Sequence, residues 1–278
     1  MPIAIVTDST ADVPPEIETR LPIYTIPNIL VLEGQSLVDG RDISRTEFYQ
    51  RLPLLKSPPT TAAPASGTFQ AQYERILCSG FTQIISIHTV SALSGIINAA
   101  SVAARMIGNN VTVVDSGQLS LGVGFQVLEA AEAAVQGLNV EAIVQHLAAV
   151  RQRLHVVAML NTLEYVRRSG RVSWARARLG SLLEIKPFIR LQDGKVLSLG
   201  EARTRRKGLE RLFNMLHSLG QLDRLAILHA NAEEDALQFL DRLKLRITHP
   251  PLVVNVTTII GTHVGPQALG FAALVQTA

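Results

Sequence analysis

Short β-branched runs alternate with helical patterns along the first half of the chain, and this alternation constrains its fold more than any other feature. The predicted strands and helices fall at residues 3–6, 83–88, 91–107, 111–114, 121–136 and 140–153. Residues 56–66 are rich in proline, threonine and alanine and predict a loop. An order of strand, helix and strand is typical of a parallel sheet with helices on its faces. We therefore expect an N-terminal α/β domain with a parallel sheet over residues 1–155.

The pattern changes after about His155. The strands predicted here are residues 156–159, 185–191, 196–199, 225–229 and 252–258, and the helices are 163–168, 175–183, 207–219 and 233–243. Asp193-Gly194 separates two of these strands and is a dipeptide that tight hairpin turns favour. The second pattern predicts a smaller C-terminal α/β domain with a mixed sheet over residues 156–278, with no flexible linker before it.

Composition and charge exclude several classes of protein. Hydrophobic residues make up 47% of the chain and charged residues 18%, which is too apolar for a disordered protein. The net charge is only +3, and the most basic stretch, Arg203 to Lys207, is short and lacks interleaved aromatic residues, so nucleic acid is not an expected partner. The single cysteine, Cys78, and the lack of CxxC and HExxH motifs argue against a structural zinc.

Motifs for export, membrane insertion and nucleotide binding are also missing from the sequence. The first residues have no basic segment ahead of an apolar core, so they do not resemble a secretory signal. Apolar runs are interrupted before they reach the roughly 18 residues that a membrane-spanning helix needs. The phosphate-loop and GxGxxG patterns do not occur. We expect a cytoplasmic protein with no metal and no cofactor, and transient contact with a membrane surface stays open.

The strongest local motif, at residues 84–95, is a strand that runs into a Ser/Gly turn and then into a helix. Free backbone N–H groups at a helix N-terminus attract anions, Ser94 adds a hydroxyl there, and Gly95 lets a ligand approach the backbone. The simpler interpretation is helix capping by a serine of the turn. A nucleophilic role for Ser94 is disfavoured, because serine hydrolases use Gly-x-Ser-x-Gly and the flanks here are Ala92 and Ile96.

Four further motifs carry polar or basic groups that have a plain structural interpretation as well. Thr61 lies in the predicted loop, where a loop or capping role is the simpler one. His263 stands between glycines after a predicted strand, and it is either a satisfied structural residue or a hydrogen-bond donor to an anion. Arg171 follows a helix end and either points into a cleft or is solvated, and Arg203 begins a basic run that a solvated surface explains.

The order of these motifs resembles that of the DegV family, bacterial fatty-acid-binding proteins that serve as substrate-carrying subunits of fatty acid kinase. The resemblance covers essentially the whole chain. The residues that carry it are Ile5 to Asp12, Asp39-Gly40, Phe48-Tyr49, Thr61, Pro64, Phe69, Ser91, Leu93 to Gly95, Val114 to Ser116, Thr162 to Tyr165, Ser169 to Ser173, Ile185 to Pro187, Arg203 to Arg205, Gly261 to His263 and Gly265-Pro266. It implies a DegV-like architecture with a three-layer α/β/α domain, a smaller domain with a mixed sheet, and a ligand in the cleft between them.

The resemblance also implies a set of site residues. They are Thr61, Ser94, Gly95, Thr262 and His263 for the carboxylate of a long-chain fatty acid, and Arg171 and Arg203 near the head group or the partner face. The implied function is non-catalytic: the protein presents the carboxylate to a separate, ATP-binding kinase subunit for acyl-phosphate formation. The sequence departs from the family pattern next to these residues, at Ala62, Ala63, Ile96, Val264 and Gln267, so the resemblance supports fatty acid binding more strongly than kinase pairing.

Elementary energetics agrees with such a ligand. Each buried methylene of an acyl tail contributes about 0.8 kcal/mol, so the tail dominates affinity. Burying the carboxylate is costly unless several donors receive it, and hydroxyls, a helix N-terminus and a histidine can do so. Two alternatives stay open: a serine-dependent esterase or acyl-transfer enzyme using Ser94 and His263, and a carrier of another amphipathic carboxylate without a kinase partner. Neither acyl length, saturation nor oligomeric state follows from the sequence.

Overall fold

The computed structural model describes residues 2–177, 185–244 and 246–277. The chain forms two compact units: the first contains residues 1–29 and 62–152, and the second contains residues 30–61 and 153–278. Residues 30–61 precede the predicted boundary yet belong to the second unit. Their side chains explain this, because Arg45 and Tyr49 donate hydrogen bonds to the backbone carbonyls of Asn255 and Val256 respectively.

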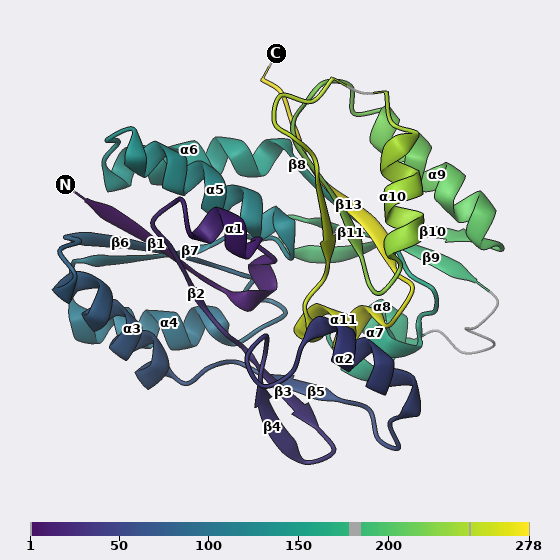
Figure 1. The fold of residues 1–278 in the computed structure, drawn as a ribbon, viewed down its shortest axis with the longest axis horizontal. Coiled ribbons are helices and arrows are strands. Elements are labelled where there is room, and N and C mark those ends of the chain that lie inside the picture. Colours follow the sequence, from purple (N-terminus) through teal and green to yellow (C-terminus); the bar gives the residue numbers. More distant parts are fainter. Residues whose placement is uncertain (1, 178–184, 245, 278) are drawn as a thin grey trace. The chain divides into compact units, whose positions relative to one another are not determined.

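The first unit contains a four-stranded parallel sheet in the order β2-β1-β6-β7. Its strands are β1 (Ile3–Asp8), β2 (Ile23–Ile26), β6 (Gln83–His88) and β7 (Val111–Asp115). Its longer helices are α3 (Ser66–Cys78), α4 (Ile96–Ile107), α5 (Leu121–Val135) and α6 (Val140–Arg153), and short helical turns cover Ser9–Ala11 and Pro15–Glu18 (α1). In Figure 1, α3 and α4 cover one face of the sheet and α5 and α6 the other, which makes three layers.

Hydrophobic patterning explains why these helices lie where they do. Every residue of β1 is buried, as the sequence of a strand covered on both faces requires. On α4 the small side chains of Ala100, Ala103 and Ala104 recur at helical spacing and lie in the core cluster beneath the sheet. The predicted helix at residues 91–107 begins later than expected, at Ile96, because residues 91–95 form a turn.

The second unit contains a six-stranded mixed sheet in the order β10-β9-β8-β13-β11-β12. Its strands are β8 (Leu154–Met159), β9 (Lys186–Gln192), β10 (Lys195–Ala202), β11 (Leu222–His229), β12 (Leu252–Asn255) and β13 (Leu269–Val275). Neighbours pair antiparallel except β11 and β12, which are parallel. The predicted hairpin is present: Asp193 and Gly194 both have positive φ between β9 and β10.

Smaller elements complete the second unit. A three-stranded sheet has the order β4-β3-β5, from β3 (Ile29–Leu32), β4 (Gln35–Val38) and β5 (Thr60–Ala62). The helices are α2 (Arg45–Arg51), a 3-10 turn at Leu52–Leu54, α7 (Glu164–Ser169), α8 (Ser173–Ala177), α9 (Arg205–His217), α10 (Glu233–Asp241) and α11 (Thr258–Val264). Side chains of α9 and α10 pack with those of β8, β11 and β13 in one core cluster.

Four sequence expectations differ from these elements. The predicted loop at residues 56–66 contains the short strand β5, and the predicted strand at 252–258 ends at Asn255. The predicted helix at 175–183 begins earlier, at Ser173, and its residues 178–183 lie outside the described part of the chain. Strand β13, a central strand of the mixed sheet, was not predicted, although its run Leu-Gly-Phe-Ala-Ala-Leu-Val is almost wholly buried.

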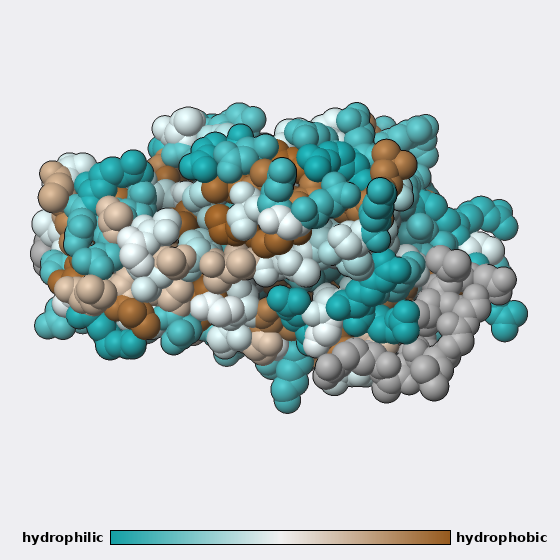
Figure 2. Space-filling view, turned by 90° about the horizontal axis from the view of Figure 1, so that it is seen from below, coloured by the Kyte–Doolittle hydropathy of each residue, from teal (hydrophilic) through white to brown (hydrophobic). Residues whose placement is uncertain are grey.

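None of the helices within residues 2–177, 185–244 and 246–277 is long and apolar enough to cross a bilayer. Polar and apolar side chains are interspersed over the face seen in Figure 2. Large exposed hydrophobic side chains include Leu54, Met106 and Val135, which lie on three different helical elements. Single apolar residues scattered in this way are normal on folded proteins.

Candidate functional site

Two predicted site residues that are far apart in sequence, Thr61 and His263, meet in the second unit. Thr61 lies on β5 and His263 in the last turn of α11, and Thr61 Oγ1 is 3.0 Å from His263 Nε2. The contact is partly buried. A hydroxyl and an imidazole at this distance share one hydrogen bond, in which either group can be the donor.

The imidazole of His263 is held in its neutral form. Burial and, as the smaller cause, the nearby positive charge of Arg171 together lower its pKa to about 4. The neutral pair of Thr61 and His263 has two polar hydrogens, one on the hydroxyl and one on the ring. Their mutual bond uses one of them, and His263 Nδ1 has no partner of its own among the described residues. One donor hydrogen therefore stays available to an external acceptor.

Helix α11 is fixed from both sides, which sets the position of His263. Thr258 Oγ1 donates a 2.7 Å hydrogen bond to Oδ1 of the buried Asp39, at the start of the helix. Gly261 allows close packing against α2, because a Cβ there would lie 2.4 Å from the hydroxyl oxygen of Tyr49. The sequence alone predicts no such role for Asp39 or Thr258. A contact across more than two hundred residues leaves no local signal in a sequence.

Thr262 is less available than its neighbours. Its side chain is buried, and its Oγ1 donates a 2.8 Å hydrogen bond to the carbonyl of Thr258, one turn back in the same helix. The hydroxyl hydrogen is therefore engaged inside α11. A carboxylate contact through Thr262 requires that this bond be released.

Ser94 and Gly95 lie in the first unit, in the turn before α4. Ser94 Oγ accepts a long hydrogen bond, 3.4 Å, from the backbone N–H of Ile96, so a weak capping contact is present. Its own hydrogen is donated to no group in the described ranges 2–177, 185–244 and 246–277. Gly95 is exposed, and a Cβ built on it would meet nothing within 4 Å. The turn thus combines a free hydroxyl hydrogen with open space beside the backbone.

Comparison with known proteins gives this arrangement a context. A model of the DegV family matches residues 2–276. A DegV domain-containing protein of Listeria monocytogenes is 32% identical over 273 residues, which cover 96% of each chain. Protein DegV of Bacillus subtilis is 33% identical over 276 residues, which cover 97% of this chain and 98% of the relative. The chain belongs to the DegV family.

Solved DegV structures share the fold of this family member. A DegV family protein of Thermus thermophilus, described by its fatty acid binding, has a TM-score of 0.91 at 32% identity and covers 99% of this chain and 100% of its own. DegV of Bacillus subtilis, described as a fatty acid binding protein, has a TM-score of 0.87 at 30% identity and covers 99% and 100%. The predicted family and the predicted α/β fold, with a parallel sheet and a separate mixed sheet, are confirmed.

The two arginines of the DegV resemblance occupy exposed positions in the second unit. Arg171 follows α7 and the left-handed Gly170, and its guanidinium donates a 2.7 Å hydrogen bond to the carbonyl of Ser169. Its charge reaches His263, whose pKa it lowers. Arg203 lies between β10 and α9. Of these two, only Arg171 is tied by its electrostatics to the Thr61–His263 pair.

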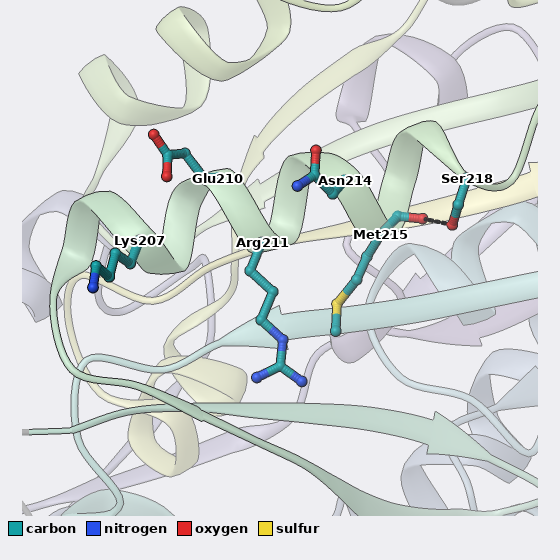
Figure 3. A pocket seen from close by; sticks show the side chains of 6 residues that line it. All are labelled: Lys207, Glu210, Arg211, Asn214, Met215 and Ser218. Atoms are coloured by element: carbon teal, nitrogen blue, oxygen red, sulfur yellow. Dashed lines mark hydrogen bonds between the residues drawn. The ribbon is translucent and has the colours of Figure 1, made fainter.

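A shallow hollow of about 590 Å³ runs along α9 but lacks the properties of an acyl-binding channel. Its lining residues, shown in Figure 3, are Lys207, Glu210, Arg211, Asn214, Met215 and Ser218. Only Met215 among them is apolar. The Arg211 guanidinium extends from the helix toward the neighbouring strands, where it donates hydrogen bonds to the carbonyls of Leu199 and Glu201. This hollow includes none of the predicted site residues.

No group of three His, Cys, Asp or Glu side chains within residues 2–177, 185–244 and 246–277 is arranged to hold a metal ion. The chemistry that the Thr61–His263 pair offers is hydrogen-bond donation from neutral groups, which suits an acceptor-only ligand such as a carboxylate.

Proposed function

We propose that this DegV protein binds a long-chain fatty acid without catalysing a reaction on it. The carboxylate is received by Thr61, Ser94, the backbone N–H of Gly95 and His263, with a smaller share for Thr262. The observation that carries the proposal is the neutral Thr61–His263 pair, which keeps one donor hydrogen beyond its own 3.0 Å bond. The fatty acid binding described for the relatives from Thermus thermophilus and Bacillus subtilis supports the same ligand class.

Neutral donors suit a carrier that must release its ligand's head group. A carboxylate has only acceptor atoms, and each hydrogen bond to a charged group contributes about 1.5–3 kcal/mol. A fixed lysine or arginine partner would hold the carboxylate more strongly, whereas hydroxyls and a neutral imidazole accept a carboxylate or an acyl phosphate alike. Most of the affinity then comes from the tail, at about 0.8 kcal/mol per buried methylene.

The more specific part of the proposal concerns a partner protein. An ATP-binding fatty acid kinase subunit in the cytoplasm phosphorylates the bound carboxylate, and Arg171 and Arg203 lie near the head group or on the docking face. Both arginines are exposed, as such a role requires. Incubating the loaded protein with a kinase subunit and labelled ATP tests this part by the appearance of acyl phosphate. No transfer to the bound acid by any matching kinase subunit would leave a carrier without this partner.

The ligand class is tested directly on the purified protein. The protein is denatured, extracted with organic solvent and analysed by mass spectrometry, and the delipidated protein is titrated with palmitic, stearic and myristic acid. We expect one or more long-chain acids in the extract and saturable rebinding. An extract without lipid, together with a delipidated protein that binds none of the three acids, would overturn the proposal.

A double-mutant cycle tests whether Thr61 and Ser94 serve the same carboxylate. Thr61→Val and Ser94→Ala each remove one hydroxyl and little volume, and each is expected to weaken palmitate binding about 10- to 100-fold. Donors to one carboxylate interact through it, so the two losses should depart from additivity by more than about 0.5 kcal/mol. Strictly additive losses would assign the two hydroxyls to separate sites, and unchanged affinity in both variants would remove them from the site.

A further inference from the structure

A continuous chain of hydrogen bonds lies in the core of the first unit, beside the turn that carries Ser94. It links Tyr73 Oη to Ser86 Oγ at 2.8 Å, Ser86 Oγ to His88 Nε2 at 2.7 Å, and His88 Nδ1 to Asp8 Oδ2 at 2.9 Å. The four residues come from α3, β6 and β1, and all are fully buried. Polar groups this deep in a core are costly unless every one of them is satisfied.

The hydrogen bonds at the two ends of this chain each have a defined donor. Burial raises the pKa of Tyr73 to about 12, so the phenol stays protonated, and Ser86 Oγ is its partner. Tyr73 therefore donates to Ser86, and Ser86 Oγ shares the next hydrogen bond with His88 Nε2. At the other end, His88 Nδ1 donates to Asp8 Oδ2, because an ionised carboxylate has no hydrogen of its own.

The chain of hydrogen bonds ends at the carboxylate of Asp8. Its Oδ1 accepts hydrogen bonds from the backbone and the hydroxyl of Thr10 and, at 2.9 Å, from the amide of Asn28. Burial by itself raises the pKa of Asp8, but the hydrogen bonds and attraction of His88, with those of Thr10 and Asn28, outweigh it and leave the pKa below its usual value. The carboxylate is thus ionised and fixed in orientation.

The same carboxylate also holds the start of the Ser94 turn. Thr89, the first residue after β6, directs its backbone N–H to Asp8 Oδ2 at 3.5 Å. The following residues are held as well: Val90 N–H donates to the carbonyl of Gln118 at 3.1 Å, and Ser91 N–H donates to Oδ2 of Asp115 at 3.2 Å. The root of the turn is therefore fixed by acceptors from β1, β7 and the segment after β7. At its tip, the side chain of Ser94 has only the long bond from Ile96 within the described part of the chain.

We propose that Asp8 and His88 are positioning residues for the Ser94–Gly95 donors, acting through Thr89. The inference rests on the proposed function, because it concerns the donors that receive the carboxylate. The decisive link is the bond from His88 Nδ1 to Asp8 Oδ2. Without it, Oδ2 keeps only the 3.5 Å contact with the Thr89 amide among the described residues, and the carboxylate is anchored by Thr10 and Asn28 at Oδ1 alone. Supporting interactions of this kind decide whether ligand-binding groups keep their geometry.

Two substitutions of His88 separate its two bonds. His88→Asn places an amide nitrogen where Nδ1 lies, so the bond to Asp8 is kept and the bond to Ser86 is lost. His88→Gln places an amide oxygen where Nε2 lies, so the bond to Ser86 is kept and the bond to Asp8 is lost. Tyr73→Phe is the matched control, because it removes the Tyr73–Ser86 bond at the far end of the chain and leaves the bond between His88 and Asp8 intact.

Palmitate affinity and the amide signal of Gly95 in a ¹⁵N-resolved NMR spectrum are the readouts, and thermal unfolding is measured in parallel. We expect His88→Gln to weaken palmitate binding about tenfold, and to shift the Gly95 signal. His88→Asn and Tyr73→Phe should stay within about threefold of the parent even where they lower the melting temperature. A purely structural role would make affinity follow melting temperature across the three variants.

Further outcomes of these measurements also support or overturn the positioning role of Asp8 and His88. Equal affinity and an unshifted Gly95 signal in His88→Gln would overturn it. If that variant does not fold, Asp8→Asn takes its place with the same expected loss and the same readouts. If the parent protein binds no palmitate, the proposed function fails, and the Gly95 signal alone then supports or overturns the positioning role.

Discussion

The neutral state of His263 predicts a specific dependence of stability on pH. The imidazole has a pKa of about 6.5 in the unfolded chain and about 4 in the folded protein. As the pH falls below 6.5, the unfolded state takes up a proton that the folded state resists, so acid favours unfolding. The contribution of the neutral imidazole to the free energy of unfolding is complete above pH 6.5 and is lost between pH 6.5 and pH 4. At about 1.36 kcal/mol per pKa unit, it amounts to roughly 3 kcal/mol.

His263→Gln isolates this contribution. The glutamine amide can keep a hydrogen bond near the position of Nε2, toward Thr61, and it does not titrate. His155 and His229 also have pKa values lowered by burial, so the parent loses stability in acid for further reasons. The difference in the free energy of unfolding between parent and variant cancels the contributions of His155 and His229, which both proteins share.

The assay is urea unfolding at several pH values between about 7.5 and 4.5, followed by the fluorescence of Trp174. This residue is the one tryptophan of the sequence and lies in the second unit with His263, so its signal reports the relevant part of the chain. We expect the free energy of unfolding of the parent to fall more steeply with acid than that of the variant. A difference that stays constant over the whole range would refute the burial of a neutral imidazole at this position.

Two further predictions concern the support of α11. Gly261→Ala forces a Cβ to within 2.4 Å of Tyr49 Oη and should destabilise the second unit by about 1–3 kcal/mol in thermal unfolding. Gly67→Ala in α3 is the control, because a Cβ there meets nothing within 4 Å, and it should be neutral or slightly stabilising in the same measurement. Thr258→Val removes the hydroxyl that donates to the buried Asp39 and should cost about 1.5–3 kcal/mol in urea unfolding. Adding Asp39→Asn to it should restore part of the loss, because an uncharged amide is cheaper to bury, and a further loss in the double variant would contradict this explanation.

The sequence was a good guide to the first unit because its signals are local. A buried run such as Ile3 to Val6 and the alanine face of α4 each contain their own periodicity, and parallel strands joined by helices have few arrangements. The mixed sheet was predicted as a class but not in full. Strand β13 pairs with β8 and β11 from either side, and a short apolar run carries no mark of which strands will flank it.

The candidate site, too, was predicted from the sequence only in part. The pairing of Thr61 with His263 agrees with what the DegV resemblance implies, although residues 56–66 alone predict only a loop. The neutral state of His263 could not be predicted, because burial and the charge of Arg171 depend on packing. The hydrogen-bond chain from Tyr73 to Asp8 was missed for a similar reason: Asp8 follows the predicted strand at residues 3–6, but nothing local connects it to His88, eighty residues later.

The interleaved course of the chain through the two units has a consequence for its synthesis on the ribosome. Residues 30–61 are translated early, but the elements that they pack against follow residue 152, and β13 comes after nearly all of them. At about 5–20 residues per second, the interval between residue 61 and residue 269 lasts roughly 10–40 s. During that time the first unit can complete its parallel sheet, while residues 30–61 wait with their apolar side chains uncovered. The apolar side chains of this segment are therefore covered only once most of the second unit has been translated.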